Sequence, residues 1–297
     1  MKKICIICNA KINFLKRYKL NKIYKILSKE NNVEIFKTEK AGHATILCKV
    51  NINKFDIIVA AGGDGTINEV VNGMNDKKPL AIIPFGTANI FALEAGIHGN
   101  AKEIAQIILS NKIKKVYVPS LNNKNFILMA SAGYDADIVK SVQSSLILKS
   151  IFKKLLFFFI ASFKLLFFKK YELKILANNK IYKANWVIVT NAMHYGGAFK
   201  LTGDTNIFNK KIITYLFCKL TRFNFLCYFF TLLVNKQLKE DNKLIKIVSD
   251  DIFISSKTKT SLQYDGEFLG YLPAQIKNSK KTINLLVKEE LNVQTDQ

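Results

Sequence analysis

The sequence predicts an N-terminal α/β domain with a parallel sheet, followed by a second, mainly antiparallel β domain. Two observations lead to this prediction. In the first part of the chain, apolar runs of strand length alternate with helical patterns, as in parallel sheets covered by helices. From Asn125 onward the apolar segments are short and lie between turn residues, as in antiparallel sheets. We therefore expect one domain at 1–120 and another at 121–297, with the extreme C-terminus able to pack back on the first domain.

The first domain is expected to contain repeated strand–helix units. The expected strands are Lys2–Cys8, Asn31–Lys37, Ile57–Ala61 and Pro79–Ile83, and the expected helices are Leu15–Leu27, the segment after Gly65, and Ile90–Ala95. Ligands of such sheets bind at the carboxyl ends of the strands. Glycine turns follow two of these strands, so both turns lie where a ligand is expected.

The second domain is expected to consist of short strands. They are Phe126–Ala130, Tyr171–Ala177, Ile181–Thr190, Lys211–Phe217, Leu244–Ser249, Ile252–Ser256 and Thr282–Val287. The pairs Asn122-Asn123 and Asn178-Asn179 are typical of turns between such strands.

The composition is that of a globular protein with an extreme positive charge. Of the 297 residues, 49% are hydrophobic and 23% are charged, and the formal net charge is +23. The lysines are spread along the chain without an Arg-rich block, which argues against nucleic acid as a partner. The charge fits an anionic membrane surface, worth about 1 kcal/mol per well-placed Lys, or a base composition that favours Lys codons.

The five cysteines lack the spacing of a disulfide framework. Cys5 and Cys8 have the spacing of a redox motif, but they lie inside an expected strand, so a buried strand is favoured over a redox or metal site. Reduced thiols suggest the cytosol, and the apolar run after Met1 is too short for a signal peptide. We expect a cytoplasmic protein, peripheral on the inner face of the cytoplasmic membrane.

Two strongly apolar stretches, Leu155–Phe163 and Phe223–Asn235, are both shorter than the ~18–20 residues needed to cross a bilayer. No transmembrane span is expected. Around the first stretch, Lys149, Lys153 and Lys164 fall on one stripe of a helical projection, which fits a core helix and a helix lying on the bilayer equally well. A core position is favoured for the second stretch.

The segment from Ile57 to Val71 runs from a buried strand through Gly62, Gly63 and Gly65 into a helix. Glycines let an anion approach the backbone amides, and the helix N-terminus adds the positive end of its dipole. An ordinary strand-to-helix turn is the alternative. Asp64 favours a functional turn, because a carboxylate beside phosphate requires a divalent cation or a role in proton transfer. The segment has neither the Lys-Ser/Thr pair of a P-loop nor the glycine spacing of a dinucleotide fold.

Three motifs in this order resemble the diacylglycerol kinase catalytic domain family, which includes bacterial soluble lipid kinases and the sphingosine kinases. They are Gly62–Gly73, Ile83–Asn89 and Asp265-Gly266-Glu267. The first motif alone is shared with NAD kinases and phosphofructokinases. Met129–Ala136 and Asn191–Phe199 also resemble family segments that line the cleft between the domains, so the resemblance covers most of the chain.

The resemblance implies an ATP-dependent lipid kinase with an NAD kinase/diacylglycerol kinase-like fold and an active site in the interdomain cleft. It implies ATP and Mg²⁺ as cofactors, diacylglycerol as the default acceptor, a lipid substrate at an anionic membrane surface, and a homodimer as an option. Asp64 is implied in Mg²⁺ and phosphate positioning, and Glu267 as the general base for the lipid hydroxyl. The implied nucleotide-binding residues are Asn9, Thr38, Gly62, Gly63, Asp64, Gly65, Thr66, Asn68, Gly86, Thr87 and Asn89.

Simpler interpretations exist for single residues. Thr38 is also suited to cap a helix, and Asp265-Gly266 is a strong signal for a hairpin turn. We expect His43 to start a helix and not to act as a catalyst.

Three positions depart from the family pattern. Of the usual Asn-Pro-x-Ser-Gly turn after the first strand only Asn9 is kept, so part of the nucleotide contact is expected to be lost. Ile90 replaces an Asp that many relatives carry, which we do not take as loss of activity. Ile207–Lys210 stands where bacterial relatives carry an acidic metal loop. With only Asp204 nearby, we expect that second Mg²⁺ site to be absent.

Two other functions remain open. One is a kinase of soluble substrates, of the NAD kinase type, and the other is a catalytically inactive lipid-binding protein. The apolar second domain and the third motif argue against the former, and Asp64 and Glu267 argue against the latter.

Overall fold

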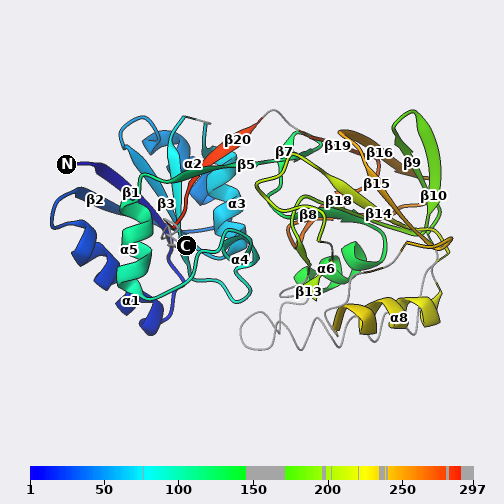
Figure 1. Cartoon of the computed structure of the whole chain (residues 1–297), viewed down its shortest axis with the longest axis horizontal. Helices are drawn as coiled ribbons and strands as arrows, with labels where there is room; N and C mark the ends of the chain where they lie inside the picture. Colours follow the sequence, from blue (N-terminus) through cyan, green and yellow to red (C-terminus); the bar gives the residue numbers. More distant parts are fainter. Residues whose placement is uncertain are drawn as a thin grey trace, which may run out of the picture. The chain divides into compact units, whose positions relative to one another are not determined.

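The computed structural model describes residues 1–75, 77–144, 171–195, 199–201, 203–219, 221–233, 238, 240–278 and 281–288. The chain divides into two compact units (Figure 1). The first contains Met1–Val116 and the segment from Lys281 onward, and the second contains Tyr117–Lys280.

The first unit is built on a six-stranded sheet with the order β2-β1-β3-β4-β20-β5. Parallel pairing joins β2 to β1, β1 to β3, β3 to β4 and β4 to β20. The strands are β1 (Lys3–Asn9), β2 (Asn32–Thr38), β3 (Ile57–Gly62), β4 (Pro79–Pro84), β5 (Ile113–Tyr117) and β20 (Thr282–Leu286). Every residue of β3 is buried, because a continuous apolar run suits a strand covered on both faces. The parallel sheet expected in the N-terminal domain is confirmed.

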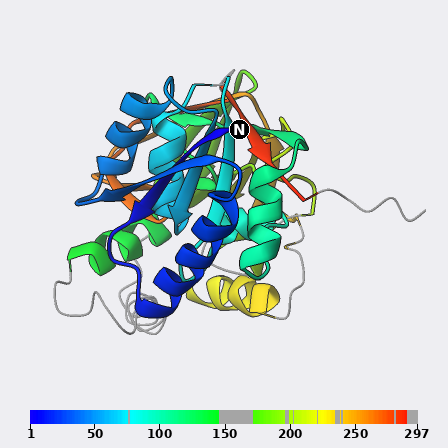
Figure 2. The same ribbon diagram turned by 90° about the vertical axis from the view of Figure 1, so that its left-hand side faces the viewer.

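Helices cover both faces of this sheet. They are α1 (Phe14–Leu27), α2 (His43–Asn51), α3 (Asp64–Gly73), α4 (Ile90–Glu94) and α5 (Ala101–Leu109). The chain moves from β1 to β2 in one direction across the sheet and from β3 to β4 in the other, so right-handed crossovers place α1 and α3 on opposite faces. α1 packs with α5 and α2 with α3, and Figure 2 shows helices on both sides of the strands.

The strand β20 corrects the expectation that Thr282–Val287 belongs to the antiparallel domain. It pairs in parallel with β4, with Asn284 opposite Pro79 and Leu285 opposite Leu80. A short apolar segment carries no signal for its neighbour, because the pairing depends on a sheet edge formed much earlier in the chain.

The second unit contains two six-stranded antiparallel sheets, with the orders β10-β9-β16-β19-β6-β7 and β15-β14-β11-β8-β17-β18. The first consists of β10 (Lys180–Ala184), β9 (Leu173–Ala177), β16 (Asp251–Ser256), β19 (Ala274–Lys277), β6 (Ser120–Leu121) and β7 (Lys124–Asn125). The second consists of β15 (Leu244–Val248), β14 (Ile213–Phe217), β11 (Trp186–Thr190), β8 (Met129–Ala132), β17 (Ser261–Tyr264) and β18 (Glu267–Tyr271). The unit also contains a small hairpin of β12 (His194–Tyr195) and β13 (Phe199–Lys200), and the helices α6 (Tyr134–Ser144) and α8 (Arg222–Leu233). The antiparallel second domain is thus confirmed.

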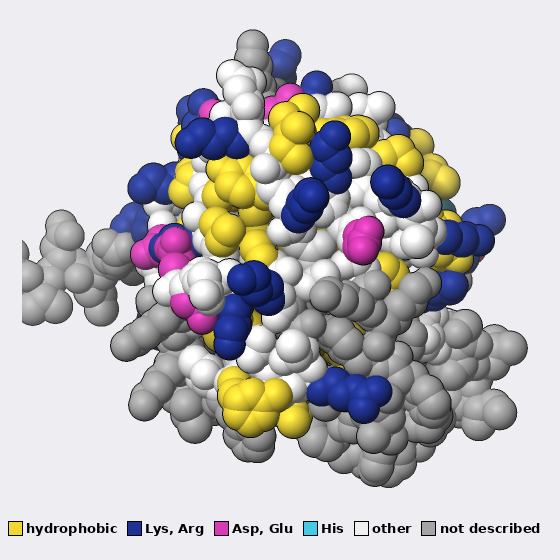
Figure 3. Space-filling model, turned by 90° about the vertical axis from the view of Figure 1, so that its right-hand side faces the viewer, with side chains coloured by type: hydrophobic (Ala, Val, Ile, Leu, Met, Phe, Trp, Pro, Cys, Tyr) yellow, Lys and Arg dark blue, Asp and Glu magenta, His cyan; other side chains and the backbone are white. Residues whose placement is uncertain are grey.

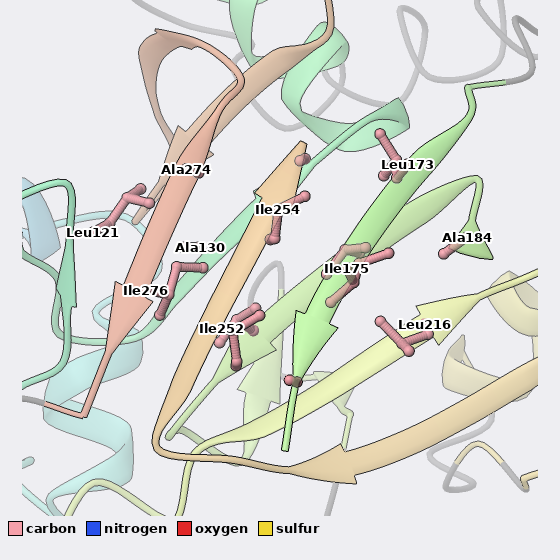
Figure 4. Close-up of a cluster of buried hydrophobic side chains, with 14 of the residues drawn as sticks. Leu121, Ala130, Leu173, Ile175, Ala184, Leu216, Ile252, Ile254, Ala274 and Ile276 are labelled. Atoms are coloured by element: carbon pink, nitrogen blue, oxygen red, sulfur yellow. The ribbon is translucent and has the colours of Figure 1, made fainter. Parts of the chain in front are cut away.

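Apolar side chains from both sheets share one buried core (Figure 4). Ile175, Ile252 and Ile254 come from the first sheet, and Leu216 comes from the second. Along β9, buried and exposed residues alternate, which is the pattern of a strand with one face on the core.

The Asn turns of this unit and most of its expected strands follow the sequence, and one expected strand is divided in two. Asn122 and Asn123 have φ angles of 45° and 67°, and Asn178 and Asn179 have φ angles of 50° and 59°. Both pairs connect neighbouring strands of a hairpin, as predicted, because Asn tolerates the left-handed region better than most residues. The divided strand is Ile181–Thr190, which forms β10 and β11 in different sheets instead of one strand.

The helix α8 corrects the expectation of a simple core segment. Phe225 and Tyr228 pack against the apolar cluster that includes Trp186. Phe223, by contrast, is 74% exposed and Leu226 is 40% exposed. Among the α8 side chains that the structure describes, Phe225 and Tyr228 therefore contribute to the core, and Phe223 and Leu226 do not.

Among the described residues, no helix is both long enough and apolar enough to cross a membrane. The apolar stretch at Leu155–Phe163 lies outside the described residues, as do Lys149, Lys153 and Lys164.

Candidate functional site

The first glycine turn joins β3 to α3 as the sequence predicts. Gly62 ends the strand, and a Cβ atom there would lie 2.5 Å from Cβ of Thr66, so a side chain does not fit. Gly63 precedes the helix in an extended conformation, and its carbonyl accepts a hydrogen bond from Ile67 N at 3.0 Å. The first turn of α3 therefore begins directly at the end of a buried strand, where its N–H groups are available to an anion.

The second glycine turn, at Gly86, lies against the first. Phe85 N donates to Gly62 O at 2.8 Å, because β3 and β4 are neighbours in the sheet. A Cβ atom on Gly86 would lie 2.7 Å from Gly63 Cα, and one on Gly63 would lie 3.0 Å from Gly86 Cα. The two backbones approach this closely because both positions are glycine.

Asp64 holds the two turns together. Its carboxylate accepts hydrogen bonds from Ile90 N at 3.1 Å and Phe91 N at 2.9 Å, at the start of α4. Burial raises the pKa of the Asp64 carboxyl, and the N–H groups of Phe91 and Ile90 act in the opposite direction. The residue is thus partly structural, which the sequence did not indicate.

A Mg²⁺ ion fits the donor set at Asp64. A carboxylate has about four acceptor positions, and the N–H groups of Ile90 and Phe91 take two of them. Mg²⁺ is commonly held by one or two carboxylates together with phosphate oxygens and water. Among the described residues, no three His, Cys, Asp or Glu side chains are grouped so that they could hold a metal by themselves. A metal at this turn would therefore depend on a phosphate ligand.

Asn89 contributes mainly to the shape of the second turn, and Asn68 has a side-chain contact within α3. Asn89 has a φ angle of 51°; its Oδ1 accepts from Gly86 N at 2.6 Å and its Nδ2 donates to Gly86 O at 3.2 Å. Asn68 is buried, and Asn72 Nδ2 donates to its Oδ1 at 3.0 Å. Thr87 is exposed on the second turn. Of these side chains, the Thr87 hydroxyl is the most accessible to a ligand.

Asn9 and Thr38 lie at the carboxyl ends of β1 and β2, directly opposite each other in the parallel ladder. Asn9 Oδ1 accepts from Lys11 N at 2.9 Å, and Thr38 is 8% exposed. The helix cap proposed for Thr38 is wrong, because α2 is preceded by Gly42. His43 starts α2 as predicted. The residues predicted to bind nucleotide thus lie at the ends of four neighbouring strands, on the turns that follow them, or in the first half of α3.

Glu69 and Lys16 also make contacts in this region that no sequence motif predicts. Glu69, on α3, accepts hydrogen bonds from Gly42 N at 2.8 Å and Ala44 N at 3.0 Å, so it caps the start of α2. Lys16, on α1, donates from Nζ to the carbonyl of Phe85. Neither pair has a sequence signal, because each joins positions far apart in the chain.

The third motif forms the turn of the β17–β18 hairpin. Tyr264 pairs with Glu267, and the two residues between them, Asp265 and Gly266, have φ angles of 45° and 80°. The hairpin turn considered for Asp265-Gly266 is confirmed. Glu267 is exposed as the first residue after the turn.

Asp265 is fixed to the chain segment before β8. Its Oδ2 accepts from Ile127 N at 2.7 Å, and its Oδ1 accepts from Leu128 N at 2.9 Å and Met129 N at 3.0 Å. These hydrogen bonds explain why the strand predicted at Phe126–Ala130 begins only at Met129. The Asp265 carboxylate therefore anchors the turn that carries Glu267.

A cluster of buried polar side chains is hydrogen-bonded to the same hairpin. Asp135 is 4% exposed and accepts hydrogen bonds from Ser131 Oγ at 2.6 Å, Trp186 Nε1 at 2.8 Å and Tyr195 OH at 3.0 Å. Burial raises the pKa of the Asp135 carboxyl, and these hydrogen bonds oppose the shift. Ser131, Asp135 and Tyr195 lie in the two segments that resemble the family, whereas Trp186 lies outside them, and no sequence motif predicts the cluster.

Gln263 connects the cluster to the turn. Its Nε2 donates to Ser131 Oγ at 2.7 Å and to an oxygen of Asp135 at 3.3 Å, while its Oε1 accepts from Gly266 N at 3.0 Å. The turn is thus held by Asp265 from one side and by Gln263 from the other.

Two further sequence-based interpretations can be compared with the structure. Asp204 forms an ion pair with Lys246 at 2.6 Å, and Lys246 also lies 3.2 Å from Glu240, so the carboxylate of Asp204 is paired with a cation. Cys5 and Cys8 are buried in β1, and burial raises the pKa of their thiols to about 12 and about 11. The buried-strand interpretation of the two cysteines is confirmed.

Comparison with known proteins points to one family. Residues 3–121 match the model of the diacylglycerol kinase catalytic domain. The chain is 30% identical over 265 residues to a diacylglycerol kinase of Staphylococcus haemolyticus, covering 86% of this chain and 78% of that protein. It is also 30% identical over 270 residues to a diacylglycerol kinase of Staphylococcus aureus, covering 86% and 84% of the two chains.

The fold has counterparts among solved structures. A diacylglycerol kinase from Bacillus anthracis matches with a TM-score of 0.74 and 23% identity, over 97% of both chains. An NAD kinase from Archaeoglobus fulgidus, solved in complex with ATP, matches with a TM-score of 0.55 and 12% identity, over 97% of this chain and 94% of that one. The expected NAD kinase/diacylglycerol kinase-like fold is confirmed.

Proposed function

The chain belongs to the diacylglycerol kinase catalytic domain family, and we propose that it is an ATP-dependent lipid kinase that transfers the γ-phosphate to a lipid hydroxyl. Diacylglycerol is the default acceptor, which would give phosphatidic acid. The observation that carries the proposal is the contact between the two glycine turns, at the carboxyl ends of neighbouring parallel strands. Backbone amides and a helix N-terminus meet there, where a phosphate chain is best accommodated.

On the nucleotide side, the residues that we propose to contact ATP lie around the two glycine turns and the ends of β1 and β2. Bound Mg²⁺ would neutralise charge that develops on the transferred phosphoryl group. Asp64 is the side chain that we propose as its protein ligand. The hydrogen bonds from Ile90 N and Phe91 N fix the orientation of this carboxylate before any ligand binds.

On the acceptor side, we propose that Glu267 takes the proton from the lipid hydroxyl as it attacks the phosphorus. Asp265 and Gln263 fix the turn next to Glu267, so the base is positioned by its backbone. A positioned base typically contributes about 10²–10⁴-fold to the rate. The proposal requires Glu267 and the glycine turns to act on the same hydroxyl and phosphate groups.

We also propose that the enzyme meets its substrate at an anionic membrane surface. Figure 3 shows Lys and Arg side chains spread over one face, among hydrophobic side chains. With a net charge of +23, attraction to anionic head groups is expected to be strong at low salt. It should weaken as the Debye length falls to about 8 Å at physiological ionic strength.

Flotation with vesicles tests the membrane proposal. Binding is expected to increase with the fraction of anionic lipid and to decrease from low to physiological salt. Equal partitioning onto neutral and anionic vesicles would show that the net charge reflects codon usage and not membrane binding.

A radiolabelled ATP assay tests the proposed reaction. The purified chain is incubated with Mg²⁺ and labelled ATP, and either diacylglycerol vesicles, a panel of other hydroxyl lipids, or NAD serves as the acceptor. Label in a lipid product supports the proposal and identifies the lipid. Label in NAD would establish the soluble-substrate kinase instead. Vesicle binding without any transfer would establish the inactive lipid-binding protein.

A further inference from the structure

Lys16 brings a positive charge to the two glycine turns from a distant part of the sequence. It lies in the first turn of α1, where its N–H group donates to Oδ1 of the capping residue Asn13 at 3.0 Å. Its side chain is half-buried and donates from Nζ to the carbonyl of Phe85, the residue before Gly86. The ammonium group is therefore fixed at the second turn.

The same point of the structure is where the two turns meet. Phe85 N donates to Gly62 O at 2.8 Å, and Gly86 approaches Gly63 so closely that a Cβ atom would clash at Gly86 and would be tight at Gly63. Lys16 Nζ thus reaches the residue that joins both turns, at the carboxyl edge of the sheet.

Among the residues that the structure describes, no acidic side chain pairs with Lys16. The hydrogen bonds of its side chain among the described residues go to a neutral carbonyl, and an ammonium group has three donors. Asp64, the acidic residue of the turns, directs its carboxylate to the N–H groups of Ile90 and Phe91. Donors of Lys16 therefore remain for another acceptor.

A protein cation beside a triphosphate at these turns would add to the charge neutralisation that Mg²⁺ provides. In a P-loop, a lysine that follows the glycine turn supplies it, but Asp64–Asn68 contains no lysine. The turn after β1 also keeps only Asn9 of the family pattern, so part of the expected nucleotide contact is missing there. Lys16 follows this altered turn in the chain and reaches the glycine turns from it.

We propose that Lys16 binds the terminal phosphates of the nucleotide, as the protein's own cation at the glycine turns. The proposal rests on the proposed function, because it assumes ATP as the phosphate donor. It predicts that Lys16 discriminates nucleotides by their phosphate chain and makes no contribution to adenosine binding.

Lys19 provides a matched control. It lies on the same helix, is also half-buried, and donates from Nζ to the carbonyl of Gly99 at 2.7 Å. Both lysines thus connect α1 to a backbone carbonyl, but Gly99 precedes α5 and is not part of a glycine turn of the site. A purely structural role predicts similar behaviour for the two lysines.

Calorimetric titration of the full chain with ATP, ADP and adenosine, in the presence of Mg²⁺, tests the proposal without relying on turnover. We expect Lys16→Gln to raise the Kd for ATP by about tenfold or more, in the range of one charge-assisted hydrogen bond, and to leave adenosine unchanged. Lys16→Arg should retain most of the affinity, and Lys19→Gln should stay close to wild type. Thermal unfolding of each variant identifies loss of folding, and Lys16→Arg preserves the charge if Lys16→Gln is unstable.

The outcomes separate this inference from the proposed function. Equal ATP affinity of Lys16→Gln and Lys19→Gln, in a wild type that phosphorylates lipid, would overturn the role of Lys16 alone. Loss of vesicle binding in Lys16→Gln with unchanged ATP affinity would also overturn it, and would assign Lys16 to the membrane surface. Lys16-dependent ATP binding without any lipid product would support the inference and overturn the proposed lipid kinase.

Discussion

Two turns carry the proposed chemistry, and an aspartate carboxylate fixes each of them to another segment. In the first unit, Asp64 accepts hydrogen bonds from the N–H groups of Ile90 and Phe91. In the second unit, Asp265 accepts hydrogen bonds from three successive N–H groups at Ile127–Met129. The same chemical device thus occurs twice, but it connects very different parts of the chain.

The two aspartates differ in how far along the sequence their hydrogen-bond partners lie, and in whether the aspartate itself has a role in the proposed reaction. Asp64 and its partners are 26 and 27 positions apart, within consecutive strand–helix units, and Asp64 stays at the phosphate site that we propose for these turns. Asp265 and its partners are 136 to 138 positions apart. Asp265 serves the turn, and the functional role in our proposal passes to Glu267. One aspartate combines two tasks that the other motif divides between two residues.

The largest expected effect on turnover without loss of stability comes from Glu267→Gln. The amide keeps the size of the carboxylate but cannot accept the proton of the lipid hydroxyl. We expect the turnover number to fall by about 10²–10⁴-fold, with little change in ATP affinity or melting temperature, because Glu267 is exposed. Steady-state kinetics with saturating ATP and a lipid acceptor measure this effect.

Glu172→Gln is the control for the loss of one negative charge in the same unit, since Glu172 is also exposed and precedes β9. It should retain wild-type turnover. Full turnover of Glu267→Gln would show that another residue is the base. In that case Asp265 and Glu267 would not divide a structural and a catalytic role between them.

The next effect compares the two aspartates directly through Asp64→Ala and Asp265→Ala. Each substitution leaves backbone N–H groups without their acceptor, two in the first case and three in the second. We expect losses in the free energy of unfolding of about 1–2 kcal/mol for Asp64→Ala and about 2–4 kcal/mol for Asp265→Ala. Urea unfolding of the full chain measures both.

Activity should show the opposite order from stability. Asp64→Ala is expected to abolish phosphoryl transfer at temperatures where it is fully folded, because it removes the proposed Mg²⁺ ligand. Folded Asp265→Ala should retain part of the turnover, because Glu267 is still present. If the activity of Asp64→Ala stays within a few-fold of wild type, Asp64 is not the Mg²⁺ ligand and has only a structural role.

The sequence predicts the local part of this picture well. The strand, glycine turn and helix at Ile57–Val71 follow from one apolar run, three glycines and a helical period, which act over a few residues. The Asn pairs of the second unit predict their turns for the same reason. The strand β20 was assigned to the wrong sheet, since its partner β4 lies about two hundred positions earlier and leaves no local trace.

The sequence predicts the motifs of the site, but it does not predict the side chains that hold these motifs in place. Recognisable motifs contain Asp64, Gly86 and Glu267, so these residues could be predicted from the sequence. Lys16 and Gln263 could not, because a lysine in a basic helix and a glutamine in a strand are ordinary residues until the fold supplies their partners. Side chains that fix a site through long-range hydrogen bonds leave no spacing in the sequence to detect.

The smallest expected effect concerns the pH dependence of stability, and it compares Asp64 with the buried Asp135 of the second unit. Burial raises the pKa of both carboxyls above the ordinary value of 3.8. The folded state then holds these protons more tightly than the unfolded state. The stability contributed by each protonated group is fully present below pH 3.8 and is lost as the pH rises through the folded-state pKa.

Asp64→Asn and Asp135→Asn remove this dependence one residue at a time, because an amide does not titrate in this range. The melting temperature of wild type minus that of each variant should therefore decrease as the pH rises above 3.8, while the other acids cancel in the difference. We expect the larger decrease for Asp135, which is 4% exposed, since Asp64 is only half-buried and is held by backbone N–H groups. Thermal unfolding of the three proteins across this pH range tests this expectation. A constant difference for Asp135→Asn would mean that the four side chains that donate to the Asp135 carboxylate fully offset the effect of burial on its pKa.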